Sequence, residues 1–298
     1  MRRWLALSLI VSCWVAVGFA VFGRSDDQNK AEKPPPHHVK RIVSLAPNLT
    51  EILFALGLDE QIVGVTFHCN YPPAAAEKPK VGTFWQPNIE AVIAAKPDLV
   101  IALRFTQQRD IAERLTRIGY NCLTVNVDKV GELFEAIGKI GSATGRHTQA
   151  AELASSLRTK LNQLSALMPT NERLKVLWVI DREPLRVAGR DTFVNELIEL
   201  AGGENAIGPT VHKYPPIGSE QVIACAADVI IEPAMAAESL AEQQRTAIEY
   251  WSRFKNVPAV ANQRVYVIPP DTVCRLGPRL YEGVETVARC LRPELFAD

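Results

Sequence analysis

Short apolar runs alternate with amphipathic stretches from residue 41 to the end of the chain. The apolar runs predict strands, and the stretches whose apolar positions recur three and four residues apart predict helices. The predicted strands are 41–45, 61–65, 98–103, 121–125, 175–180, 229–232 and 264–268. The predicted helices are 48–57, 88–96, 106–118, 131–145, 191–203, 219–228 and 277–291. The first of them is predicted to begin with a capping box, in which Asn48 is the N-cap and Glu51 follows three residues later. Strands that alternate with helices indicate parallel sheets with helices on both faces.

One longer amphipathic stretch, 147–168, separates the two groups of strands. It contains no Gly or Pro, ends at Pro169, and carries one stripe formed by Leu153, Leu157, Leu161, Leu164 and Leu167. A helix of this length extends about 33 Å, which is longer than one lobe is wide. The predicted fold class is therefore α/β: two Rossmann-like lobes with parallel sheets, joined by one long backbone helix. The predicted boundaries are 41–145 for the N-terminal lobe, 146–168 for the connecting helix and 169–298 for the C-terminal lobe.

The two predicted lobes repeat each other in sequence. Residues 88–102 align without gaps with residues 218–232, and Glu90/Glu220 and Asp98/Asp228 are among the identical pairs. A second pair of segments, 50–57 and 195–202, matches in the same order. Two helix–strand units that recur in order predict two lobes of similar construction.

The N-terminus has the pattern of an export signal. Arg2 and Arg3 precede an apolar run from Trp4 to Phe22, which is long enough to cross a bilayer as an uncleaved anchor. The segment 10–13, which ends at Cys13, resembles a lipobox, so residues 1–24 are predicted to be a cleaved signal peptide, a signal anchor or a lipidation signal. In each case the positive-inside rule places the rest of the chain outside the cytoplasm. The polar, proline-containing segment 25–40 is predicted to be a flexible linker.

Composition and charge exclude several classes of protein. The 298 residues are 47% hydrophobic and 22% charged, with 33 basic and 33 acidic residues, so neither disorder nor nucleic-acid binding is expected. None of the six cysteines lies in a CxxC motif, so no structural zinc site is predicted. The chain contains no GxSxG, P-loop, GxGxxG or HExxH motif, and no catalytic residue is predicted. His68 and Cys69 alone are too few to bind a metal, and no protein metal site is predicted.

Aromatic and arginine side chains gather in the predicted loops that follow the strands. These loops are 66–73, 82–87, 103–108, 181–188, 209–217 and 270–276. They contain Phe67, His68, Tyr71, Phe84, Trp85, Phe105, Tyr214, Arg104, Arg182, Arg186 and Arg275. Because ligands of parallel α/β sheets bind beyond the carboxyl ends of the strands, these residues predict a site for a large, flat, partly polar ligand between the lobes.

Several segments resemble a known family. RIVSLAPNLTEILFALG, NIEAVIAAKPDLVIA, DTFVNELIELAGGENA and SEQVIACAADVII are similar to segments of the substrate-binding proteins of ABC importers for cobalamin (vitamin B12), ferric siderophores and haem. The resemblance covers about 41–292 and is greatest to the cobalamin binders. It implies an extracytoplasmic (periplasmic) transport protein that captures a corrinoid between its lobes, performs no chemistry and delivers the ligand to a membrane permease dimer. It also implies a monomer without a cofactor of its own, and lobes that move little on binding.

The resemblance assigns candidate site residues. The ligand-binding positions are His68, Tyr71, Phe84, Trp85, Arg104, Tyr214, Asp271 and Arg275, whereas Leu103 and Leu185 replace aromatics. Glu90 and Glu220 are the expected transporter-docking residues. Cys290 matches one half of a family disulfide, but Ala201 stands at the other position, so this bridge cannot form.

Three alternatives stay open at this point. A ferric siderophore or haem is the alternative ligand, since Arg104, Arg186 and Arg275 would suit an anionic chelate. A chelatase-like enzyme would instead require titratable groups in the cleft, of which His68, Asp271 and Glu183 are the candidates. A membrane-anchored scaffold without a small ligand is the third possibility.

Overall fold

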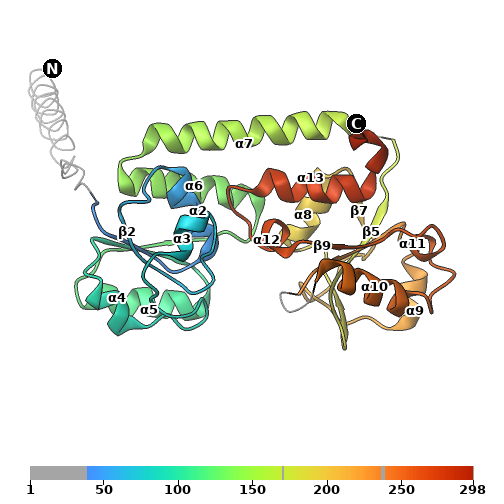
Figure 1. The fold of residues 1–298 in the computed structure, drawn as a ribbon, viewed down its shortest axis with the longest axis horizontal. Helices are drawn as coiled ribbons and strands as arrows, with labels where there is room; N and C mark the ends of the chain where they lie inside the picture. Colours follow the sequence, from blue (N-terminus) through green and yellow to red (C-terminus); the bar gives the residue numbers. More distant parts are fainter. Residues whose placement is uncertain (1–38, 170, 236–238, 298) are drawn as a thin grey trace, which may run out of the picture. The chain divides into compact units, whose positions relative to one another are not determined.

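The N-terminal lobe is a parallel sheet with helices on both faces. The computed structural model describes residues 39–169, 171–235 and 239–297 (Figure 1). The strands of this lobe are β1 (Ile42–Ser44), β2 (Ile62–Val65), β3 (Leu99–Leu103) and β4 (Cys122–Val125), in the order β2-β1-β3-β4. The helices are α2 (Pro47–Ala55), α3 (Pro73–Ala76), α4 (Ile89–Ala94), α5 (Thr106–Arg117) and α6 (Val130–Thr144).

The C-terminal lobe repeats this arrangement and adds an antiparallel edge. Its strands are β5 (Lys175–Arg182), β6 (Leu185–Val187), β7 (Glu204–Asn205), β8 (Val229–Pro233) and β9 (Val265–Ile268). Their order is β6-β5-β8-β9, with β7 paired to β5 and only β6 antiparallel. The helices are α8 (Phe193–Leu200), α9 (Ser219–Ala224), α10 (Leu240–Trp251), α11 (Pro258–Ala261), α12 (Pro270–Val273), α13 (Leu280–Leu291) and a 3-10 turn at Pro293–Phe296.

Helix α7 (His147–Leu167) runs over both lobes in Figure 1. The predicted fold class, with its long backbone helix, is thereby confirmed, while the lobe boundaries given above stay a prediction. Leu157, Leu161 and Leu164 are buried, but Leu167 is 60% exposed. At 3.6 residues per turn, Leu167 is rotated about 80° from Leu157, which turns it away from the buried stripe.

The two lobes share one hydrophobic core. A continuous cluster of buried side chains runs from β1 and α2 through α6 and α7 to α8 and α13. Leu133 and Ile137 of α6 and Val284 and Val287 of α13 belong to this cluster. Each sheet has a second, separate core on its other face, beneath α4 and α5 in one lobe and beneath α9 and α10 in the other. A large rotation between the lobes would expose part of the shared core.

We therefore expect the lobes to keep their relative position when a ligand binds. Small-angle X-ray scattering of the protein with and without bound ligand should give radii of gyration that agree within experimental error, because exposing apolar surface costs about 25 cal/mol per Å². A decrease of several per cent on ligand binding would contradict this expectation.

The internal repeat is confirmed by backbone geometry. Helices α4 and α9 are followed by residues with the same positive φ of 45°, Lys96 and Ala226. Asp98 then accepts the amide of Arg41 at 2.9 Å, and Asp228 accepts that of Lys175 at 2.8 Å. In both lobes, the carboxylate just before the strand that follows this helix, β3 or β8, therefore accepts an amide at the start of the lobe's first strand, β1 or β5.

Three local predictions were wrong. Ala46, not Asn48, is the N-cap of α2, since Pro47 is its first residue. Helix α9 ends at Ala224 and not at the predicted residue 228, because Ala226 has a positive φ. The predicted loop 181–188 is the β5–β6 hairpin. Helix α10 lies in a segment for which no element was predicted.

The predicted signal or anchor (residues 1–24) and residues 25–38 of the predicted linker lie outside the described residues. Within the described ranges, no helix is both long and apolar enough to span a membrane. The described cysteines, Cys69, Cys122, Cys225, Cys274 and Cys290, are all free thiols.

Candidate functional site

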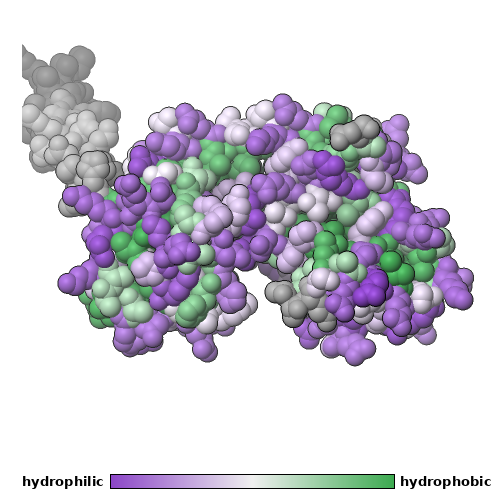
Figure 2. Space-filling view, viewed as in Figure 1, coloured by the Kyte–Doolittle hydropathy of each residue, from purple (hydrophilic) through white to green (hydrophobic). Residues whose placement is uncertain are grey.

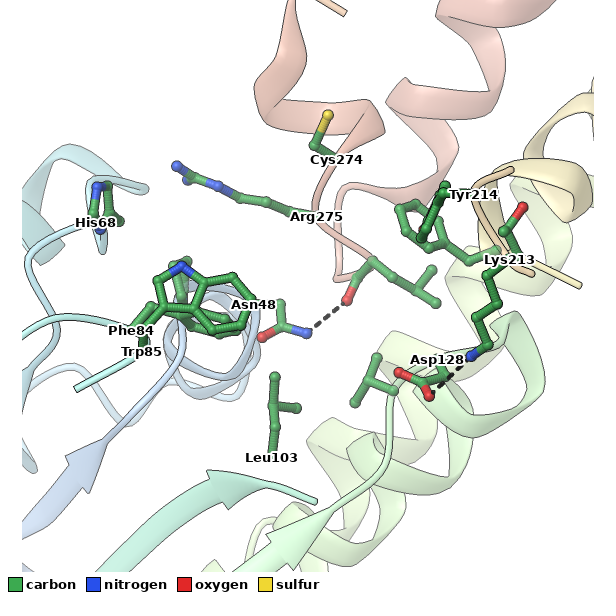
Figure 3. Close-up of a pocket in the computed structure, with 15 residues that line it drawn as sticks. Asn48, His68, Phe84, Trp85, Leu103, Asp128, Lys213, Tyr214, Cys274 and Arg275 are labelled. Carbon is green, nitrogen blue, oxygen red and sulfur yellow. Dashed lines mark hydrogen bonds and ion pairs between the residues drawn. The ribbon is translucent and has the colours of Figure 1, made fainter. Parts of the chain in front are cut away.

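A cavity of about 520 Å³ lies where the strand-end loops of the N-terminal lobe face the C-terminal lobe (Figure 3). On the surface, the two lobes are separated by a cleft that opens away from α7 (Figure 2). The N-terminal lobe lines the cavity with Pro47, Asn48, His68, Phe84, Trp85, Leu103, Val127 and Asp128. The C-terminal lobe contributes Thr192, Phe193, Lys213, Tyr214, Cys274, Arg275 and Leu276.

An aromatic cluster forms the wall of the cavity on the side of the N-terminal lobe. The Phe84 ring stacks on Phe105 with centroids 5.1 Å apart, and Trp85 packs edge-on against both, at 4.9 and 5.6 Å. Trp85 is 62% exposed, which is unusual for so large an apolar side chain. The indole therefore offers an open apolar surface toward the cavity, while Phe84 packs partly into the core.

Backbone contacts fix the loop that carries these rings. Gly82 has a φ of +105°, and a Cβ there would lie 2.5 Å from the Asn88 nitrogen, so only glycine fits. The buried Gln108 side chain donates to the carbonyl of Phe84 at 3.0 Å and to that of Leu45 at 2.7 Å. The aromatic wall is thus positioned in advance of any ligand.

The opposite wall comes from the loop that carries Lys213 and Tyr214. The amide of Gly189 donates to the Lys213 carbonyl at 2.8 Å, and that of Val187 donates to Pro215 at 3.2 Å. Burial and then the neighbouring Asp128 carboxylate raise the pKa of the Tyr214 phenol. Tyr214 is therefore neutral at physiological pH and offers a ring and a hydroxyl.

Arg275 lies in the cavity but is engaged by three partners. Its guanidinium donates to Asn70 Oδ1 at 2.6 Å and pairs with Asp271 at 3.2 Å and Glu51 at 3.9 Å. The neighbouring Cys274 also lines the cavity, where burial raises the pKa of its thiol to about 11. The Cys274 thiol is therefore protonated at neutral pH.

The structure brings five of the eight predicted ligand-binding residues to this cavity: His68, Phe84, Trp85, Tyr214 and Arg275. Tyr71 and Asp271 do not line the cavity. The Tyr71 ring packs against Arg279, whose guanidinium lies 3.9 Å from the ring centroid, and Asp271 pairs with the cavity residue Arg275. Arg104 instead lines a separate hollow between α5 and β4, with Arg109 and Arg117. The ligand-binding role of all eight stays a prediction.

Sequence reasoning missed Asn48, Asp128 and Thr192 among the lining residues. Asn48 was interpreted as a helix cap, but its amide donates to the Leu276 carbonyl across the lobes at 3.1 Å. Asp128 follows a predicted strand and could have been found by extending the loop search to the residues after 121–125.

Glu90 and Glu220, the predicted docking residues, are exposed in the first turns of α4 and α9. In Figure 1 these helices lie at the ends of the two lobes farthest from α7. No ion pair of either glutamate is present among the described residues. No cluster of three or more metal-binding side chains occurs in the described part of the chain.

Comparison with known proteins gives a consistent result. Residues 42–272 match the model of a family described as periplasmic binding protein. An uncharacterised ABC transporter substrate-binding lipoprotein, YvrC of Bacillus subtilis, is 32% identical over 92% of this chain and 86% of its own length. A vitamin B12-binding protein of Vibrio cholerae is 28% identical over 86% of this chain and 91% of its own.

Solved structures share the fold. The periplasmic vitamin B12-binding protein BtuF of Vibrio cholerae has a TM-score of 0.73 and 25% identity, covering 86% of this chain and 98% of that one. The periplasmic haem-binding protein BhuT in complex with two haems has a TM-score of 0.74 and 26% identity, covering 86% and 99%.

Proposed function

This chain belongs to the periplasmic binding protein family as a solute-binding protein of an ABC transporter, and we propose that its ligand is a corrinoid held between the two lobes. The observation that carries this proposal is the pair of facing walls. Trp85 and Phe84 from one lobe and Tyr214 from the other line a single cavity, as a flat macrocycle requires. The protein would bind the corrinoid outside the cytoplasm and deliver it to a permease dimer, with no chemical step.

The charges around the cavity favour a macrocycle with neutral side groups. Arg275 is already satisfied by Asn70, Asp271 and Glu51, and Arg104 lies outside the lining. Two of the three arginines that would suit an anionic chelate are therefore not available to it. The peripheral amides of a corrinoid need hydrogen-bond partners but no counter-charge, and Asn48, Thr192 and Tyr214 offer such partners.

Haem or a ferric siderophore is the second candidate ligand. Lys213 and His68 line the same cavity and are groups that a carboxylated, iron-containing ligand could use. BhuT, which is similar to this chain, is named for haem binding. Titration of the full chain with cobalamin, haemin and a ferric siderophore, followed by absorbance and tryptophan fluorescence, separates the two candidates. The proposal requires the tightest binding for cobalamin.

We expect Trp85→Ala and Tyr214→Ala each to weaken cobalamin binding by about 1–3 kcal/mol, the range for loss of a well-packed aromatic anchor. His68→Ala should also weaken binding, since its ring lines the cavity. Isothermal titration calorimetry gives the dissociation constants. Tyr281→Ala is the matched control, because this half-buried tyrosine packs against Lys160 away from the cavity. Unchanged affinity in all three site variants would place the ligand elsewhere.

A further inference from the structure

An ion pair links the two lobes inside the cavity. Lys213 Nζ of the C-terminal lobe lies 3.5 Å from Asp128 Oδ2 of the N-terminal lobe, and both residues line the cavity (Figure 3). Their side chains are 48% and 63% exposed, so water and salt weaken their attraction. The pair therefore adds little to stability, and another charged group that enters the cavity can compete for either partner.

The backbone on both sides of this pair is fixed. The Asp128 amide donates to Glu132 Oε2 at 2.8 Å, and the Lys213 carbonyl accepts from the Gly189 amide at 2.8 Å. A Cβ at Gly189 would lie 2.6 Å from Thr210 Oγ1, so this glycine allows the Lys213 loop to pack closely. Because each backbone segment is held by a hydrogen bond, rotation of the two side chains is the simplest way to change the partner of the Lys213 ammonium.

The other permanently charged cation that lines the cavity, Arg275, has more partners than Lys213. Arg275 is held by Asn70, Asp271 and the buried Glu51, whereas the only ion-pair partner of Lys213 among the described residues is Asp128. An anionic group of a ligand would find its most accessible counter-charge at Lys213. To reach it, that group would have to approach or displace the Asp128 carboxylate, at a cost in like-charge repulsion. A neutral amide meets no such repulsion.

We propose that Asp128 is a specificity-determining residue, which holds Lys213 and thereby favours macrocycles with amide side groups over those with carboxylates. This inference rests on the proposed corrinoid function and adds the chemical basis of selection at the same site. Asp128 acts here through Lys213 and is a positioning residue. Specificity would then come from withholding a cation from the wrong ligand as well as from contacts to the right one.

The test compares two ligands that differ by one charge. Cyanocobalamin and its monocarboxylate isomers, each with a single peripheral amide hydrolysed, are titrated separately into the full chain, and the ratio of their dissociation constants is the readout. The wild type should bind the amide form more tightly than at least one carboxylate isomer. Asp128→Asn should reduce that preference about two- to fivefold, the range for an exposed ion pair, and the change should shrink in about 0.5 M salt.

Two further variants identify the cause. In a Lys213→Met background, Asp128→Asn should no longer change the ratio, because the ammonium that Asp128 withholds is gone. Glu135→Gln is the matched control: Glu135 pairs with Lys139 at 3.2 Å on the exposed side of α6, neither residue lines the cavity, and the change should leave the ratio unchanged.

An unchanged ratio in Asp128→Asn, or a full effect that persists without Lys213, would overturn the inference while cyanocobalamin binding still supports the proposed function. Failure of the wild type to bind cyanocobalamin would overturn both.

Discussion

Replacing Arg279 by methionine should lower the free energy of unfolding by about 3–5 kcal/mol, the cost of leaving a buried charge without its partner. The carboxylate of Glu51, which is 3% exposed, accepts from Arg279 Nη2 at 2.6 Å and Nε at 2.9 Å. Glu51 lies on α2 and Arg279 immediately precedes α13, so this bidentate pair joins the two lobes. Equilibrium unfolding in urea, followed by circular dichroism, gives the change.

The loss of stability should depend on pH with a definite sign. Burial raises the pKa of the Glu51 carboxyl, and its hydrogen bond and charge interaction with Arg279 oppose that rise. In Arg279→Met most of that opposition is lost and only the attraction of Arg275 remains, so the pKa of folded Glu51 rises further above its unfolded value near 4.5. A group with a raised folded pKa favours the folded state below the unfolded pKa, and that contribution is lost as the pH rises through the folded pKa. The defect should therefore be smallest near pH 4.5 and grow toward neutral pH.

Two variants test whether the buried charge is the cause. Arg289→Met removes an arginine from α13 whose own side chain is 54% exposed and whose partner at 2.9 Å, Glu285, is partly buried. Because solvent reaches this pair, the change should cost no more than about 1 kcal/mol. The double variant Glu51→Leu/Arg279→Met removes both buried charges and should recover much of the lost stability. A loss in Arg279→Met no larger than in Arg289→Met would contradict the argument.

The same contacts explain why the cavity is preformed. Glu51 also attracts Arg275 at 3.9 Å, and Asn48, one turn earlier on α2, donates to the Leu276 carbonyl. The segment that brings Arg275 and Leu276 into the cavity is thus held against the N-terminal lobe by two interactions, one ionic and one a hydrogen bond. Arg279→Met should consequently weaken cobalamin binding as well as stability.

The fold could be predicted because its signals are local. Apolar runs such as 98–103 mark strands without any knowledge of their neighbours, and the leucine stripe marks α7. Helix α10 escaped prediction although it buries Gln243, Ala247 and Trp251. Its buried face includes a glutamine whose amide bonds to the backbone of Met235, and hydropathy alone cannot distinguish such a residue from an exposed one.

The site was predictable only in part, because its polar contacts join residues far apart in sequence. Aromatic loop residues such as Trp85 and Tyr214 could be found from their type and their place after strands. Glu51 and Arg279 are 228 positions apart, and the local pattern around Glu51 indicated a helix cap. Arg104 follows β3 as expected, but its side chain lines a separate hollow with Arg109 and Arg117, so its ligand-binding role stays a prediction.

The largest functional effect is expected at a distance from the cavity: Glu90→Ala/Glu220→Ala should bind cobalamin normally yet lose transport. The two glutamates occupy equivalent positions of the internal repeat, one in each lobe, and both are exposed without an ion-pair partner among the described residues. A carboxylate in the first turn of a helix is locally favourable, which explains one such residue but not a matched pair. Two equivalent acids on a pseudo-twofold body suit basic residues on the two subunits of a symmetric permease.

Uptake of labelled cobalamin by cells that contain the permease measures the effect. Each single alanine variant should be intermediate, because one of two anchors is left, and charge reversal to arginine at both positions should transport less than the double alanine variant, since repulsion then replaces attraction. Glu113→Ala/Glu249→Ala is the matched control, with one exposed glutamate removed from each lobe on α5 and α10. Normal uptake by the Glu90/Glu220 double variant would reduce both residues to a helix-stabilising role, whereas weaker cobalamin binding would place them in the ligand site.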